Sequence, residues 1–254
     1  MHFRSASMRK SDRRPLPDTP GYDRIVRSAD NRLGAVYSSL HAFWMARSRV
    51  VATGNAKRDA YSVIFHDEIT TPCFENDLGS TPDQLLERLL PIRPSGGNSF
   101  NLALNAAKAT MEHHWSSERS ISGMYVVVKQ WADDWNRAPV VIFLSDGACD
   151  VSEMNMNRLC RSAKSLGWGL SIYSYFEVSP LSNSKALSFH GVSFGPVAKS
   201  ESLRKMAEIA RNVQATDVDP SSPAVESSCV EALKTVSLHK TFDSLANLCG
   251  CALC

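Results

Sequence analysis

The chain has 254 residues, of which 43% are hydrophobic and 21% are charged. These fractions are typical of a globular protein and exclude a disordered chain, a coiled coil and a collagen-like repeat. The formal net charge of +2 is too small to indicate a nucleic-acid partner. No apolar run approaches the ~20 residues that a transmembrane helix needs, so we expect no membrane span.

The seven cysteines are an odd number, and no apolar signal sequence precedes them. The chain also has no Asn-x-Ser/Thr site for glycosylation. We therefore expect a reduced, cytoplasmic protein rather than a secreted module held by disulfides. The cysteine spacing fits no zinc-finger pattern.

The first part of the chain predicts two helices separated by a strand. Apolar residues recur at helical spacing in Leu33–Trp44, and either Asp30 or Asn31 can cap this helix. Asp59–Phe65 is rich in β-forming residues between polar turns, which predicts a strand. Thr81–Leu90 has proline in its first turn, as helices often do.

The remainder of the chain continues this alternation of helices and strands. The apolar patterns predict helices at 100–114, 156–166 and 203–210 and strands at 139–144 and 188–194. Pro139–Leu144 is an uninterrupted apolar run, typical of a central strand covered on both faces. The order favours an α/β fold, with a Rossmann-like, doubly wound and mostly parallel sheet between two layers of helices.

Polar loops at strand ends and helix starts supply a candidate metal site. They are Ser5-Ala6-Ser7-Met8, Gly96-Gly97-Asn98-Ser99-Phe100 and Leu144-Ser145-Asp146-Gly147. Ligands of such sheets bind where the strands end. Hydroxyl, amide and carboxylate oxygens suit Mg²⁺ or Mn²⁺ better than zinc. The candidate metal ligands are Ser5, Ser7, Asn98 and Asp146.

These loops resemble those of the von Willebrand factor type A domain. VVIFLSDG is similar to the strand and aspartate of its metal-ion-dependent adhesion site, GGNSF to its threonine loop, and SASM to its serine loop. FGPVAKSESLRKMAEIA resembles the family's last strand and helix. The resemblance extends from about Phe3 to Asn212 and is closest to an intracellular branch found in fungi. It implies a three-layer sandwich and a non-enzymatic module, in which a partner's acidic side chain completes the coordination of the metal.

The chain also departs from the family pattern. Phe3 occupies the position of the first aspartate, Asn98 occupies that of the threonine, and the first strand looks truncated at Met1. Ser99 supplies a replacement hydroxyl only if the turn shifts by one residue. We therefore expect an incomplete site that binds Mg²⁺ or Mn²⁺ weakly.

The resemblance divides the chain into three parts. Residues 1–30 form a basic, proline-containing segment, 31–212 form the domain, and 213–254 form a linker, a helix and a cysteine-rich tail. Insertions near 121–136 and 172–186 interrupt the domain, as surface excursions, as retained introns, or as a real strand at Met124–Val128. Cys251 formally fits a prenylation box.

Simpler interpretations of the same residues stay open. Asp146 before Gly147 also suits a plain turn, Asn98 can serve only as a helix cap, and Ser5 and Ser7 can lack any role. His41, His113 and His114 have no carboxylate at ligand spacing and are interpreted as structural residues.

The sequence contains no nucleophile elbow, phosphate loop or dinucleotide fingerprint, so we expect no enzyme activity. The alternatives to a metal-dependent interaction module are a metal-independent α/β scaffold and a metal-dependent hydrolase or phosphotransferase. The enzyme would use Asp146 and would require a second carboxylate or a base beside it.

Overall fold

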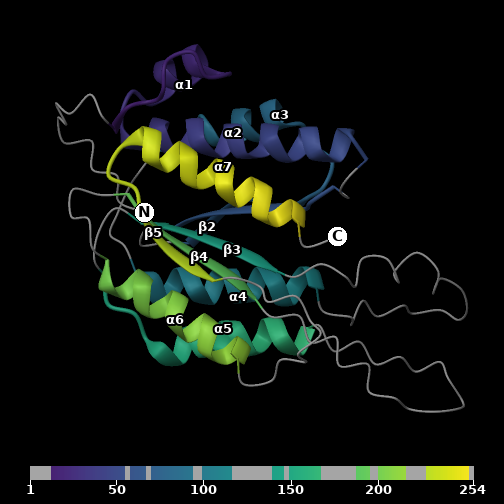
Figure 1. Ribbon diagram of the computed structural model, residues 1–254, viewed down its shortest axis with the longest axis vertical. Helices are drawn as coiled ribbons and strands as arrows, with labels where there is room; N and C mark the ends of the chain where they lie inside the picture. Colours follow the sequence, from purple (N-terminus) through teal and green to yellow (C-terminus); the bar gives the residue numbers. More distant parts are fainter. Residues whose placement is uncertain are drawn as a thin grey trace, which may run out of the picture.

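The computed structural model describes residues 13–54, 58–66, 70–93, 99–115, 139–145, 149–166, 187–194, 200–215 and 227–251. The elements form three layers, with the strands in the middle (Figure 1). One outer layer contains α1 (Tyr22–Ser28), α2 (Arg32–Ala52), α3 (Pro82–Leu89) and α7 (Thr235–Cys251). The other contains α4 (Phe100–Trp115), α5 (Glu153–Leu166) and α6 (Glu201–Ala215).

The strands of the middle layer form two sheets. β1 (Tyr61–His66) and β2 (Thr70–Asp77) form an antiparallel hairpin. β3 (Val140–Ser145), β4 (Ser188–Ser193) and β5 (Ser228–Glu231) form a parallel sheet in the order β3-β4-β5. The predicted α/β fold, with a parallel sheet covered by helices on both faces, is confirmed.

Local sequence signals explain where two of the helices begin. Asn31, rather than Asp30, caps α2, because its side-chain oxygen accepts a hydrogen bond of 2.9 Å from the Leu33 N–H. Thr81 and Gln84 form a reciprocal capping box at the start of α3. The predicted helices at Leu33–Trp44 and Thr81–Leu90 are therefore confirmed, with the first extended to Ala52.

Two apolar clusters lie on opposite faces of the parallel sheet. The first lies against α2, α3 and α7 and includes Val36, Leu86, Val192 and Phe242. The second lies against α4, α5 and α6 and includes Phe100, Leu159, Phe189 and Met206. Alternate residues of β3 face the two clusters, as the two-residue period of a strand requires.

The junction between α1 and α2 requires a glycine. A Cβ atom built on Gly34 would lie 1.8 Å from the carbonyl oxygen of Ala29. Only a residue without a side chain allows this close approach of the two backbones.

The expectation that 139–144 is a strand covered on both faces is confirmed, because its side chains pack alternately against the two clusters, whereas a central position is not seen within the part of the chain that the structure describes. β3 has one partner there, β4, and its Val140 side chain is 41% exposed. β4 has a neighbour on each side, and every one of its residues is buried. β4 is therefore the central strand of the parallel sheet, although its sequence alternates between polar and apolar residues.

Residues after 213 contribute β5 and α7 to the same sheet and core as residues 31–212. The Arg47 side chain, 1% exposed, joins three regions of the chain. Its Nε donates to Asp59 Oδ2 at 2.7 Å, and its Nη1 donates to the carbonyl oxygen of Ala246 in α7 at 3.2 Å. The insertions expected near 121–136 and 172–186 and the prenylation box beyond Cys251 lie outside the described residues.

Candidate functional site

The candidate site lies at the carboxyl edge of the parallel sheet. The three strands end close together there, because the Phe194 N–H donates to Ser145 O at 2.7 Å and the Ala232 N–H to Ser193 O at 2.8 Å. Ser145 and Ser193, the last residues of β3 and β4, are 3% and 4% exposed, so these two strands end in buried residues. Polar loops leaving this edge are in the usual position for ligand binding in such sheets.

The helix that follows the Gly96–Asn98 loop begins directly beside β3. Its first residue, Phe100, has its ring 5.0 Å from the ring of Phe143, two residues before the end of β3. Ser99 caps this helix, since its hydroxyl oxygen accepts a hydrogen bond of 3.4 Å from the Leu102 N–H. The hydroxyl of Ser99 is thus engaged with the first turn of α4, which argues against its use as the replacement metal ligand.

The segment that follows the Asp146 loop is tied to the same helix start. The side-chain oxygen of Asn101 accepts a hydrogen bond of 2.8 Å from the Ser152 N–H, and Ser152 immediately precedes α5. The amino-terminal ends of α4 and α5 are therefore adjacent. Helix amino termini are partly positive, so this edge favours a carboxylate or another anion.

α6 also begins at this edge. The Ser200 hydroxyl, on a residue 4% exposed, accepts from the Leu203 N–H at 3.3 Å. In the next turn, Lys205 pairs with Glu153 of α5 at 2.6 Å, and this partner raises the pKa of Lys205. The pair links the first turn of α5 to the second turn of α6.

The first described residue of the chain also lies at this edge. Arg13, 8% exposed, is the first described residue, and its Nε donates to the carbonyl oxygen of Leu233 at 3.1 Å. Leu233 lies just after β5. The described residues nearest to all three predicted loops therefore lie at one edge of the sheet.

The predicted ligands themselves, Ser5, Ser7, Asn98 and Asp146, lie outside the described residues. Within the described ranges, no group of three or more histidine, cysteine, aspartate or glutamate side chains could hold a metal ion. As a donor set, the four residues supply one carboxylate together with neutral hydroxyl and amide oxygens. They suit a hard cation in type but provide little negative charge for it.

Exposed apolar side chains gather where helices begin at this edge. Leu102 in α4 and Met154 in α5 are 44% and 57% exposed. Leu233 and Val236, at the start of α7, are 44% and 50% exposed. We call these four residues the apolar rim. The helical patterns at 100–114 and 156–166 indicate the buried faces of α4 and α5 but give no sign of these outward residues.

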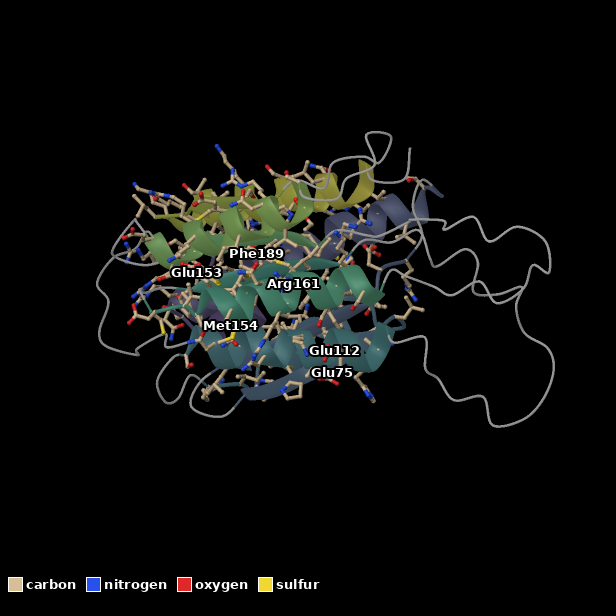
Figure 2. All side chains as sticks on the ribbon, turned by 90° about the horizontal axis from the view of Figure 1, so that it is seen from below. Glu75, Glu112, Glu153, Met154, Arg161 and Phe189 are labelled. Atoms are coloured by element: carbon tan, nitrogen blue, oxygen red, sulfur yellow. The ribbon has the colours of Figure 1, made fainter. Side chains whose placement is uncertain are left out.

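A second polar cluster, which the sequence does not indicate, joins β2 to α4. Glu75 accepts hydrogen bonds from Thr110 Oγ1 at 2.9 Å and from His114 Nε2 at 3.2 Å. These two partners, Thr110 first, hold the pKa of Glu75 below its ordinary value. Glu112, which Figure 2 labels together with Glu75, belongs to the same helix as Thr110 and His114 but accepts instead from Lys108 Nζ at 2.7 Å and from Ser162 Oγ at 2.8 Å. The sequence does not predict this cluster, because β2 contains Pro72 and its pattern does not predict a strand.

The histidines are structural, as the sequence predicts for His41 and His114. His41 is 1% exposed, and its Nδ1 lies 2.9 Å from the carbonyl oxygen of Pro20. Its Nε2 lies 3.4 Å from Asp83, a carboxylate that also pairs with Arg24. This side chain therefore joins α2 to α3 and to the segment before α1.

Among the described residues, no helix is both long enough and apolar enough to span a membrane.

No known family model matches the sequence, and no curated protein matches it either. Among solved structures, the chain is similar to a protein described as a von Willebrand factor type A from Catenulispora acidiphila. The two are 11% identical, with a TM-score of 0.48 over 85% of this chain and 38% of that protein. The chain thus spans well under half the length of that protein.

Proposed function

We propose that the chain is a non-enzymatic protein-interaction module of the von Willebrand factor type A kind. It binds an acidic side chain of a partner at the carboxyl edge of the parallel sheet, with a weakly held Mg²⁺ or Mn²⁺ between them. The observation that supports the proposal is the contact of Phe100 with Phe143, because Phe100 follows Asn98 by two residues and Phe143 precedes Asp146 by three.

Two further features support binding of a protein at this edge. The adjacent amino termini of α4 and α5 favour a carboxylate, which a partner can supply. The apolar rim offers surface that would be covered on docking, since exposed apolar side chains around a polar centre are typical of interaction sites. A cytoplasmic location accompanies this proposal, and Cys73, Cys160 and Cys229 are free thiols.

The weak binding of the metal follows from the chemistry of its four proposed ligands. Asp146 supplies the only carboxylate among Ser5, Ser7, Asn98 and Asp146, so the ion retains positive charge that an external carboxylate can balance. Without a partner, the ion is held weakly. In the partner's presence, metal and carboxylate bind together, and each raises the affinity of the other.

The test uses the full chain and a fluorescent peptide with one aspartate in a neutral sequence. We expect binding in 10 mM Mg²⁺ that falls at least tenfold in chelator and at least tenfold for the asparagine version of the peptide. Asp146→Ala should remove the Mg²⁺ dependence, and Met154→Lys should weaken binding. The matched control is Leu248→Lys, which changes a residue of similar exposure, 49%, near the far end of α7.

A phosphatase assay with para-nitrophenyl phosphate separates this proposal from an enzyme. Turnover by the unmodified chain that Asp146→Ala abolishes would establish the hydrolase alternative. Binding of the aspartate peptide at equal strength in magnesium and in chelator would instead establish a metal-independent module.

A further inference from the structure

The buried side chain of His41 in α2 is held between a backbone carbonyl and a carboxylate. Its Nδ1 lies 2.9 Å from the carbonyl oxygen of Pro20, and its Nε2 lies 3.4 Å from Asp83 Oδ1. Pro20 belongs to the segment that precedes α1, and Asp83 lies in the first turn of α3. Each ring nitrogen of one imidazole therefore meets a different part of the chain.

The carbonyl of Pro20 determines which nitrogen of the neutral ring carries the proton. A carbonyl oxygen only accepts hydrogen bonds, so Nδ1 must be the donor. Nε2 of the neutral ring then presents a lone pair to a carboxylate oxygen, and two acceptors form no hydrogen bond. Addition of a proton to Nε2 converts this contact into an ion pair with a charge-assisted hydrogen bond.

The turn before α1 lies directly on the imidazole. Gly21 has a φ of 80°, and a Cβ atom built on it would lie 3.3 Å from His41 Nδ1 and 2.9 Å from Leu86 Cδ2. A glycine is required for both the positive φ and the close approach. The backbone that leads into α1 therefore depends on the position of the His41 ring.

The charges around Asp83 favour a positive imidazole. Arg24 of α1 pairs with the same oxygen of Asp83 and, at 2.8 Å, with Glu87 of α3. Two carboxylates thus share one guanidinium, and a proton on His41 supplies the charge that makes the group neutral. Arg24 first, and His41 to a smaller degree, hold the pKa of Asp83 below its ordinary value, so this carboxylate stays ionised in mild acid.

The other charged and titratable residues of these elements have other partners or are in contact with water. They are Asp18, Tyr22, Asp23 and Arg27 of the segment and α1, Arg32, Tyr37, Arg47 and Arg49 of α2, and Arg88 of α3. Within the described part of the chain, Asp83 is therefore the charged group that the imidazole itself meets. Arg24 and Glu87 act on His41 through it.

We propose that His41 is a pH-sensitive latch that fastens residues 13–28 to α2 and α3. The protonated ring bridges the carbonyl of Pro20 and the carboxylate of Asp83. Loss of the Nε2 proton removes the pair with Asp83 and leaves the bond to Pro20. Histidine is the side chain whose charge ordinarily changes between about pH 5 and pH 8, which makes such a bridge responsive to mild acid.

The direction of the pH dependence follows from the bridge. An ion pair that only the protonated histidine of the folded chain can form contributes stability at acid pH, and this contribution is lost as the pH rises. The lowered pKa of Asp83 preserves the carboxylate over the same range. Residues 13–28 should therefore be held most firmly in mild acid and less firmly toward pH 8.

The latch is separate from the carboxyl-edge site of the proposed function. It uses other residues, and its test needs neither Mg²⁺ nor an acidic peptide. Failure of either proposal therefore leaves the other unaffected.

The first readout is the protonation of His41 in the full chain, measured in chelator by NMR of nitrogen-15-labelled imidazoles. We expect a neutral ring with its proton on Nδ1 at about pH 8 and a ring with both nitrogens protonated at about pH 5. The second readout is hydrogen exchange of α1, corrected for the intrinsic effect of pH. Protection should be roughly threefold or more greater at the lower pH, as expected for one ion pair of this exposure.

Two carboxylates of α3 provide a matched pair of variants. Asp83→Asn should remove the pH dependence of α1 protection. Glu87→Gln is the control and should retain it, since Glu87 also pairs with Arg24 and is 56% exposed, against 58% for Asp83. His41→Asn, whose amide can still donate to Pro20 O, should behave as Asp83→Asn does.

Three results would overturn the proposal. A His41 ring with the same charge at both pH values would mean that it exchanges no proton in this range. A neutral ring protonated on Nε2 would contradict the bond to Pro20. Equal pH dependence in Asp83→Asn and Glu87→Gln would show that Asp83 is not the partner that His41 requires.

Discussion

Phe100 and Phe143 meet edge to face, with ring centroids 5.0 Å apart and ring planes at 67°. Phe143 contacts in turn the ring of Phe189 in β4, at 6.2 Å. This row of rings links the first residue of α4 to two strands of the parallel sheet. It holds the start of α4 against the sheet.

Phe100→Ala should lower the free energy of unfolding by about 3 kcal/mol, because it empties a site in which the ring is 2% exposed. Urea denaturation followed by circular dichroism measures the change. Leu102→Ala, two residues further along the same helix and 44% exposed, is the control and should change stability by less than about 0.5 kcal/mol. Equal effects of the two substitutions would show that the aromatic row does not hold α4.

Gly34→Ala should destabilise the protein by at least about 2 kcal/mol, since the added Cβ would lie 1.8 Å from Ala29 O and the two backbones must separate. The comparison is Gly79→Ala, where a Cβ meets nothing within 4 Å. The measurement compares the melting temperatures of the two variants with that of the parent chain. A neutral Gly34→Ala variant would mean that α1 does not pack on the start of α2.

Asp59→Ala should cost about 3 kcal/mol, because it leaves the buried guanidinium of Arg47 without its carboxylate. The same urea titration applies. Arg47→Lys tests the geometry, since lysine cannot reproduce the two donor directions toward Asp59 and Ala246. If Asp59→Ala is as stable as the parent chain, the pair contributes nothing to the attachment of α7.

The Glu75 cluster should make stability depend on acid pH. Thr110 and His114 lower the pKa of Glu75 in the folded protein, so its contribution is complete above the ordinary glutamate pKa of about 4.3. It is lost as the pH falls through the lower folded pKa. The difference in unfolding free energy between the parent chain and Glu75→Gln should shrink from pH 5 to pH 3. Urea denaturation of the two chains at each pH measures this difference, and a difference that does not change between pH 5 and pH 3 would contradict the prediction.

Mg²⁺ should bind the unmodified chain more weakly than about 1 mM. At an effective dielectric of about 20, a missing carboxylate near 4 Å costs a few kcal/mol with a divalent ion, and hence a factor of hundreds in affinity. The double variant Phe3→Asp with Asn98→Thr should bind at least tenfold more tightly in calorimetry. Adding Asp146→Ala should abolish that gain. Micromolar affinity of the unmodified chain that depends on Asp146 would refute the prediction.

The sequence predicts those elements whose side chains carry a strong period or an explicit cap. The sequence predicts α2 and α3 because Asn31 and Thr81 mark where these helices begin. It predicts β1 because polar turns bound its run of β-forming residues. The sequence does not predict β2, because Pro72 and the polar residues at its end are unusual in a paired strand. The burial of β4 depends on its two neighbours, which no local pattern reveals.

In the candidate site, too, the sequence predicts individual residues but not the contacts that the fold creates between them. The sequence identifies oxygen-bearing residues such as Asp146 but not what supports them. The bond between Asn101 and Ser152 joins residues 51 apart, and neither belongs to the motif. The cluster of Glu75 with His114 likewise depends on a contact across the fold. Such pairs become visible only when the chain is folded.

The attachment of α7 has a consequence for how the protein is made. Arg47 and Ala246 are 199 residues apart in sequence, and Arg13 and Leu233 are 220 apart. At roughly 5–20 residues per second, a ribosome needs roughly 10–40 s to add the residues between Arg47 and its partner. Throughout that interval the face of α2 that α7 will cover stays exposed. This part of the fold therefore forms only after Ala246 has been added and has left the ribosome, later than contacts between residues that are close in sequence.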